Sequence, residues 1–318
     1  MPHTPSIASM GGEPEIPYHD IGTVGKRPRI ALVAGLAGQE LNGTFALARL
    51  ADYLRGVADG DYPDQRLRHR VLIIPAAMTA KATDHGDSAP SEQLPQAARA
   101  ADGELPTAPE AEAQSLLEAT RAAYYRVEIR GSGPEVEEVP QVRLYQCSDD
   151  ERASAFLFGL PAIIEHPAHG LCSGSLVREW HRLGGENFIL YAGQVGHLQL
   201  QHCERLFRAL VSFLDRAEIL EGVELSKEEE DTHHFGPHQT LPVFSEVAGF
   251  FVSCLEVGRW VRAGESVGTI YDPFLGTLVT DIRSPVNGLV SAIRRHPLFK
   301  AGELVARMQT HDSLPQGW

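Results

Sequence analysis

Residues 30–43 read IALVAGLAGQELNG, and this stretch decides the fold. It opens with five consecutive apolar residues, turns through Gly35 and Gly38, and then favours a helix capped by Asn42. A buried strand, a glycine turn and a helix in this order form the unit from which α/β proteins are built. Such a unit directs the strand end and the helix start at one crevice. Glu40, the ionisable side chain of that turn, is therefore the first candidate for a site.

Strands and helices alternate over the following residues. Apolar runs predict strands at residues 71–75, 125–130, 142–147, 161–165 and 187–192. Periodic apolar positions and a capping box at residues 107–110 predict helices between them, and the periodic apolar positions of residues 203–214 predict a further helix after the last strand. Residues 131–140 are expected to form a loop. The alternation predicts a doubly wound α/β domain over residues 28–222, preceded by an N-terminal arm at residues 1–27. Residues 79–109 hold few large apolar side chains, so we expect a long loop or insert there.

The pattern changes after residue 222. Residues 223–239 carry an acidic run and the histidine tract His233–His238, and we predict an interdomain linker. A metal tract is the alternative for these histidines, on composition alone. From residue 240 to residue 318, short apolar runs separated by Gly and Pro predict a small all-β domain.

The composition and net charge narrow the classes of partner that this chain can bind. The chain has 318 residues, of which 43% are hydrophobic, and a formal net charge of −14. That charge argues against nucleic acid or an anionic membrane as partner. We find no apolar run near the ~20 residues that span a bilayer and no signal-peptide pattern. The four cysteines form no CxxC pair, so we expect a reducing, cytoplasmic location.

Two segments resemble a known family. AGLAGQELNG at residues 34–43 is similar to the zinc-binding turn AGxHGxExxG of the succinylglutamate desuccinylase/aspartoacylase family, relatives of zinc carboxypeptidases. Residues 242–293 resemble the small β-domain of the same family. The resemblance implies a carboxypeptidase-like mixed sheet with a C-terminal all-β domain. It also implies hydrolysis of the amide of an N-acyl amino acid. The zinc ligands would be a His and a Glu in the first turn and a second His ending a later strand. A further strand would supply a glutamate as general base, and an Asn-Arg pair would bind the substrate carboxylate.

The chain departs from that pattern at the site. Ala37 stands at the first His, Arg130 at the second His, and Tyr191 at the general base, which leaves Glu40 as the surviving ligand position. The Asn-Arg pair is not recognisable in residues 79–109. A catalytic zinc takes about three His, Cys, Asp or Glu ligands, whereas alanine has no donor atom and arginine keeps its proton. We therefore expect no metal and no other cofactor.

These departures favour a pseudoenzyme. Its partner would be a small N-acyl amino acid or another carboxylate, an active paralogue, or a second copy of the chain. We expect the Arg130 guanidinium to take the metal position and pair with Glu40, since an unpaired buried carboxylate is costly. The alternative is that Arg130 points to solvent.

Two further functions stay open. In the first, the chain is an active amidohydrolase with a rebuilt site that uses Glu40, His166 or His169, with zinc or without metal. The phrase Glu165-His166-Pro-Ala-His169 follows a predicted strand and lies near Cys172, but Pro167 breaks the helix on which this spacing serves a metal. Hydrogen-bonded loop histidines are the alternative. In the second, the chain is a structural or assembly subunit.

Overall fold

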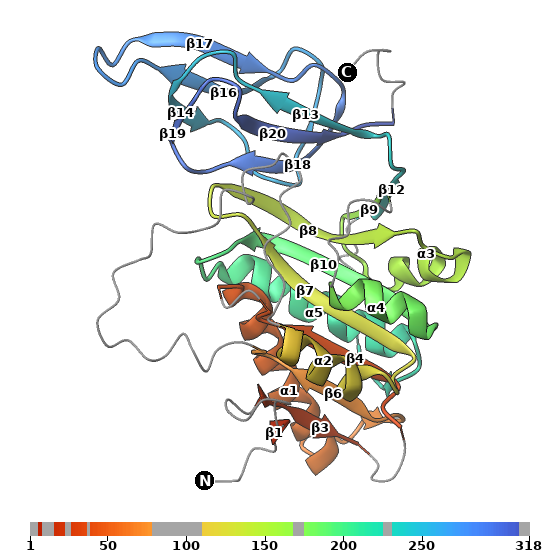
Figure 1. Ribbon diagram of the computed structural model, residues 1–318. Helices are drawn as coiled ribbons and strands as arrows, with labels where there is room; N and C mark the ends of the chain where they lie inside the picture. Colours follow the sequence, from red (N-terminus) through yellow and green to blue (C-terminus); the bar gives the residue numbers. More distant parts are fainter. Residues whose placement is uncertain are drawn as a thin grey trace, which may run out of the picture.

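A mixed sheet of twelve strands forms the centre of the computed structural model, which describes residues 6–7, 16–22, 27–36, 39–77, 110–167, 175–224 and 231–311. The strands follow the order β13-β20-β18-β8-β10-β7-β4-β6-β3, and β9, β12 and β15 pair beside this path (Figure 1). Their bounds are β3 His19–Ile21, β4 Ile30–Ala34, β6 Val71–Ile74, β7 Tyr125–Ser132, β8 Val136–Tyr145, β9 Ala162–His166, β10 Glu186–Gln194, β12 His233–Phe235, β13 Thr240–Phe244, β15 Trp260–Val261, β18 Gly288–Arg294 and β20 Leu304–Gln309.

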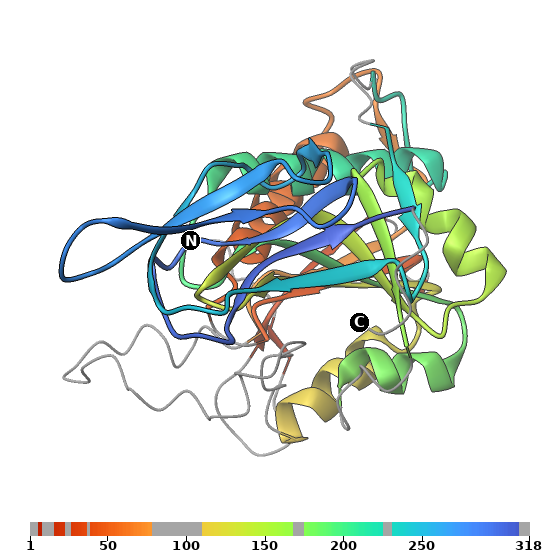
Figure 2. The same cartoon turned by 90° about the horizontal axis from the view of Figure 1, so that it is seen from above.

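Helices cover both faces of the parallel part of this sheet, which consists of β6, β4, β7 and β10. Helices α1 (Leu41–Asp59) and α5 (Leu200–Arg216) lie on one face, and α2 (Glu110–Thr120) and α4 (Leu176–Leu183) lie on the other (Figure 2). Helix α3 (Asp149–Ala155) and the 3-10 turn η3 (Phe156–Phe158) connect β8 to β9. The predicted doubly wound α/β fold is thereby confirmed.

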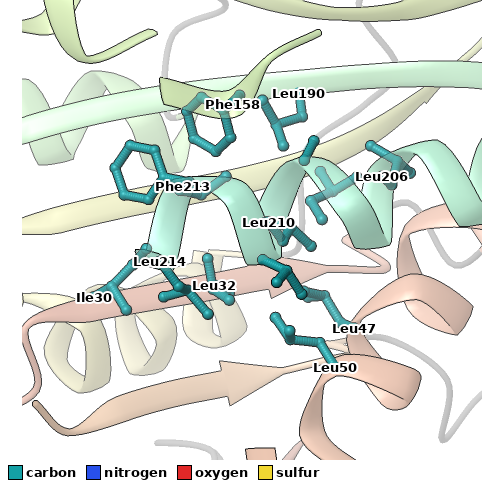
Figure 3. Packing of buried hydrophobic residues seen from close by; sticks show 14 of the residues in the cluster. Ile30, Leu32, Leu47, Leu50, Phe158, Leu190, Leu206, Leu210, Phe213 and Leu214 are labelled. Atoms are coloured by element: carbon teal, nitrogen blue, oxygen red, sulfur yellow. The ribbon is translucent and has the colours of Figure 1, made fainter. Parts of the chain in front are cut away.

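The alternation along each strand builds two cores. Ile30 and Leu32 of β4 pack with Leu47 of α1 and with Leu210 and Leu214 of α5 (Figure 3). Ala31 and Val33 of the same strand face the other side, where they lie in one cluster with residues of α2 and α4. Because successive side chains of a strand point to opposite faces, a continuous apolar run serves both layers.

The C-terminal region is all-β, as predicted, and shares the main sheet. Strand β18 pairs with β8, so hydrogen bonding continues from the α/β part into β20 and β13. Strands β14 (Gly249–Ser253), β16 (Ser266–Tyr271), β17 (Leu278–Arg283) and β19 (Leu298–Phe299) form a second sheet. The β16–β17 hairpin projects from this region, and Phe274 at its tip is 93% exposed (Figure 1).

Several predicted boundaries were wrong. Helix α1 has Glu40, not Asn42, at its N-cap, and no side chain caps it. Strand β8 begins at Val136, inside the loop expected over residues 131–140.

Parts of the predicted arm and linker are strands. The arm over residues 1–27 contributes β1 (Ser6–Ile7), β2 (Ile16–Pro17) and the edge strand β3. Residues 223–239 contain β12, which pairs with β9. Strands β5 (Arg66–Leu67) and β11 (Leu220–Glu221) form a separate ladder. The insert at residues 79–109, with most of the predicted capping box, lies outside the described residues.

Candidate functional site

The carboxyl ends of β4, β7 and β10 meet where the sequence places the site. Arg130 of β7 pairs in register with Tyr191 of β10, and Glu40 lies between β4 and α1. All three residues are buried. Ala37 lies outside the described residues. The topology thus brings three of the four predicted positions to one end of the parallel strands, which is where α/β proteins bind their ligands.

Arg130 is held by Glu128. Its Nε and Nη2 donate to the two carboxylate oxygens of Glu128 at 2.5 Å and 3.1 Å, and the side chains are 7% and 1% exposed. Residues two apart on a strand share a face, so β7 itself places the pair. The alternative that Arg130 points to solvent is therefore wrong. The expected pair between Arg130 and Glu40 stays a prediction.

A second arginine covers Tyr191. The Arg143 guanidinium carbon of β8 lies 3.6 Å from the centroid of the Tyr191 ring, close enough for a cation–π contact. Burial lowers the pKa of Arg143, but the charges of Glu138, Tyr191 and Tyr145 outweigh it and raise that pKa. Tyr191 therefore lies under a permanent positive charge.

Glu138 is the common hydrogen-bond acceptor for the polar groups beside this contact. It accepts hydrogen bonds from Gln141 Nε2 at 2.7 Å, from Arg307 Nη1 of β20 at 2.9 Å, and from Arg143 Nη2. We call Glu138, Gln141, Arg143 and Arg307 the Glu138 cluster. It joins the α/β part to the C-terminal strands on the same face of the sheet as Tyr191.

His166 ends β9 next to this cluster. It pairs in register with Tyr145, and the two rings stack with centroids 5.2 Å apart. Burial, followed by the charges of Arg143 and Arg307, lowers the pKa of His166 to about 3, so its ring is neutral at ordinary pH. Its Nε2 is buried and has no hydrogen-bond partner in the described part of the chain, and the same holds for Gln141 Oε1 and Arg143 Nε.

Glu165, the described neighbour of His166 in the predicted motif, makes its contacts elsewhere. Glu165 accepts from Arg152 Nε at 2.6 Å and contacts His234 Nε2 at 2.8 Å. Burial acts to raise the pKa of Glu165, but these two groups lower it. Adjacent residues of a strand point to opposite faces, which separates Glu165 from His166. His169 and Cys172 lie outside the described residues. His233 packs on Trp260 with ring centroids 4.8 Å apart.

A second polar cluster, which the sequence did not suggest, lies at the starts of α1 and α5. His202 Nε2 is 2.6 Å from Glu137 Oε1, and Arg295 donates to the other oxygen of Glu137. Asn42, predicted as a cap, instead accepts from the backbone N–H of Gln199 at 2.7 Å. Gln199, Asn42 and His202 also pack so closely around Gly193, near the end of β10, that an added Cβ would clash with them.

These side chains do not fit the zinc that the family resemblance implies. Strand β7 offers a guanidinium, and β10 offers a phenol beneath another guanidinium. Across the described ranges, no three His, Cys, Asp or Glu side chains are grouped as a metal ion requires. Likewise, no helix in the part of the chain that the structure describes is long and apolar enough to span a bilayer.

Comparisons with known proteins identify the fold. No family model matches the sequence, and no curated protein matches it. Among solved structures, the product-bound ectoine utilization protein EutE (DoeB) of Ruegeria pomeroyi is similar, with a TM-score of 0.67 and 21% identity over 96% of this chain and 93% of that one. A succinylglutamate desuccinylase/aspartoacylase of Rhodobacter sphaeroides has a TM-score of 0.68 and 19% identity, over 95% and 94% of the two chains.

The likeness extends to more distant sequences. A putative family protein of Shewanella amazonensis has a TM-score of 0.69 at 13% identity, over 97% of this chain and 98% of that one. At such identities the sequence details have diverged while the architecture has persisted. The chain therefore has the fold of the succinylglutamate desuccinylase/aspartoacylase proteins over nearly its full length.

Proposed function

We propose that this chain binds a small carboxylate ligand and does not carry out zinc-dependent amide hydrolysis. The observation that carries the proposal is the buried ion pair between Arg130 and Glu128. Arg130 stands where the family resemblance implies a zinc ligand, at the carboxyl end of β7. A guanidinium is a permanent cation that donates hydrogen bonds and accepts none, so it repels a metal ion and binds an anion.

The surroundings support the same function. Arg143 lies over Tyr191, the position at which the family resemblance puts the general base. A phenol under a positive charge is a poor acceptor for a proton from water, and a guanidinium cannot lower the pKa of water as zinc does. Arginine is, by contrast, well suited to hold a carboxylate through paired hydrogen bonds. The crevice therefore has cationic groups suited to a carboxylate and lacks the zinc ligands and the general base that hydrolysis would need.

The alternative of a rebuilt amidohydrolase uses Glu40, His166 or His169, and of these His169 lies outside the described residues. With a pKa of about 3, His166 would hold a proton too weakly to act as an efficient base near neutral pH. The alternative of an assembly subunit makes no use of the buried arginines. Both alternatives remain outcomes of the experiment below.

The test combines metal content with turnover. Protein produced with zinc in the medium is expected to hold far less than one zinc per chain by plasma mass spectrometry. It is expected to leave N-acetyl, N-succinyl and N-formyl amino acids intact. An active desuccinylase or aspartoacylase assayed in parallel is the positive control. Turnover that a chelator abolishes would refute the proposal, and turnover that survives chelation would favour the rebuilt site.

A further inference from the structure

We propose that Gln141, Arg143 and His166 form a binding site for a monocarboxylate that carries a hydrogen-bond donor on the adjacent carbon. The site lies on β8 and β9, beside Arg307 of β20 in the same sheet. The inference deepens the proposed function, and it rests on that function only in taking this side of the sheet to be a ligand crevice.

The three residues share one face of neighbouring strands. Gln141 and Arg143 alternate along β8, and both donate to the same oxygen of Glu138, so the two side chains converge. His166 lies opposite Tyr145, the next residue of that face, in the register of β8 and β9. Arg143 pairs in register with Ile164, two residues before His166 on the same face of β9.

Each residue offers a polar atom that has no hydrogen-bond partner among the described residues. These atoms are Gln141 Oε1, Arg143 Nε and His166 Nε2, and Gln141 as a whole is only 1% exposed. The orientation of the Gln141 amide is fixed, because the carboxylate of Glu138 only accepts and must face the NH2 group. A buried polar atom without a partner costs free energy, and three in one cluster indicate a group that supplies what they lack.

The charges select an anion. Arg143 and Arg307 share the single carboxylate of Glu138, while Gln141 and His166 are neutral. Taken together these five side chains carry one net positive charge, and the side chains of Arg143 and Arg307 are only 12% and 17% exposed. A bound monoanion would cancel it, and the gain is larger in a buried site than at the surface.

The hydrogen-bond types define the rest of the ligand. Arg143 Nε–H donates, and His166 donates when its ring proton is on Nε2, so together they match the two oxygens of a carboxylate. Gln141 Oε1 accepts and needs an O–H or N–H beside that carboxylate. A 2-hydroxy acid meets all three requirements, whereas a simple fatty acid leaves Gln141 Oε1 without a partner.

Calorimetric titration of the full chain tests the assignment. The probes are glycolate, acetate and inorganic phosphate at millimolar concentrations. We expect glycolate to bind more tightly than acetate, and phosphate to bind weakly. Arg143→Lys keeps the charge and can keep the contact with Glu138 but removes Nε–H, so it should weaken glycolate binding by about tenfold or more. His166→Phe keeps a ring against Tyr145 and should weaken it similarly.

Arg49→Lys is the matched control, because Arg49 forms an exposed ion pair with Glu204 remote from these residues, and it should leave binding unchanged. Nuclear magnetic resonance adds a readout that a structural role would not move, since bound glycolate should raise the pKa of His166. Three results would overturn the site: no binding by the unaltered chain, phosphate binding as tight as glycolate binding, or full affinity in both variants. Hydrolysis of an N-acyl amino acid would instead refute the proposed function and leave these titrations to decide the site.

Discussion

At the scale of the residue, we expect the buried Glu128–Arg130 ion pair to have a large effect on stability. Both side chains are almost fully buried, and removal of one partner from a buried ion pair leaves a charge without its counter-ion. Glu128→Gln should therefore lower the free energy of unfolding by about 3 kcal/mol. Urea denaturation followed by circular dichroism measures this loss.

The exposed pair between Arg49 and Glu204 supplies the comparison. Both of its side chains are about 40% exposed, so Glu204→Gln should cost less than about 1 kcal/mol. The double variant Glu128→Gln with Arg130→Met should recover part of the loss, because it removes the uncompensated charge. Equal effects of Glu128→Gln and Glu204→Gln would show that the buried pair is not a coupled unit.

Gly193 allows a second prediction at this scale. Its φ is +68°, and an added Cβ would lie 2.2 Å from Gln199 Oε1 and 2.6 Å from Asn42 Nδ2. Gly60 has a φ of +89° but no atom within 4 Å of an added Cβ. Gly60→Ala should cost about 1 kcal/mol for the left-handed backbone, and Gly193→Ala at least about 2 kcal/mol more because Gln199 and Asn42 must move. Thermal unfolding of the two variants compares them directly, and equal costs would rule out the steric explanation.

At the scale of the element, Glu137 ties β8 to α5 and to the turn after β18. Burial acts to raise the pKa of Glu137, but hydrogen bonds from His202 and Arg295 lower it below the ordinary 4.5. A lowered carboxyl pKa stabilises the folded chain above the ordinary pKa, and this contribution is lost as the pH falls below it. The free energy of unfolding should therefore fall more steeply between about pH 5 and pH 3 in the natural chain than in Glu137→Gln.

The urea midpoint measured across this pH range checks the slope. Glu256→Gln is the control, since Glu256 contacts Arg295 from a position with 82% side-chain exposure. That variant should keep the slope of the natural chain. Parallel pH profiles for the natural chain and Glu137→Gln would show that Glu137 does not link the elements in this way.

Prediction from sequence succeeded where a pattern is repeated along an element. The apolar run of β4, the periodic face of α5 and the Gly/Pro-spaced strands after residue 240 all gave the right element type. Prediction failed where a residue was assumed to interact only with residues close to it in the sequence. Asn42 bonds to Gln199, 157 positions away, and the loop expected before residue 142 is drawn into β8 by its partners β10 and β18.

The site shows the same division. Glu40, Arg130 and Tyr191 were placed in one site by the family resemblance, which aligns each of them with a residue of the family's zinc site. Glu128 could have been found from the two-residue period of β7. Glu138 and Arg307, by contrast, are 169 positions apart in the sequence and form a hydrogen bond because β18 pairs with both β8 and β20. No pattern of neighbouring residues in the sequence predicts such a contact.

At the scale of the whole molecule, the shared sheet predicts cooperative unfolding. Strand β18 is hydrogen-bonded to β8, which is in turn bonded to β10, so the α/β part cannot open along this line without exposing the C-terminal strands. Hydrogen exchange followed by mass spectrometry should give β10 and β18 the same opening free energy within about 1 kcal/mol. The short β5–β11 ladder should exchange faster and serves as internal reference. Earlier exchange throughout β18 and β20 would show that the two regions unfold separately.

The Glu128–Arg130 pair also bears on how this molecule could change over evolutionary time. A single substitution of Arg130 to histidine would introduce a zinc-ligand type, but it would leave Glu128 buried without its present cation partner. Such a step would reduce stability before any metal could be bound, and Ala37 and Tyr191 would have to change as well. A zinc site at this position would therefore require several substitutions together, because the first one alone removes the partner of a buried carboxylate.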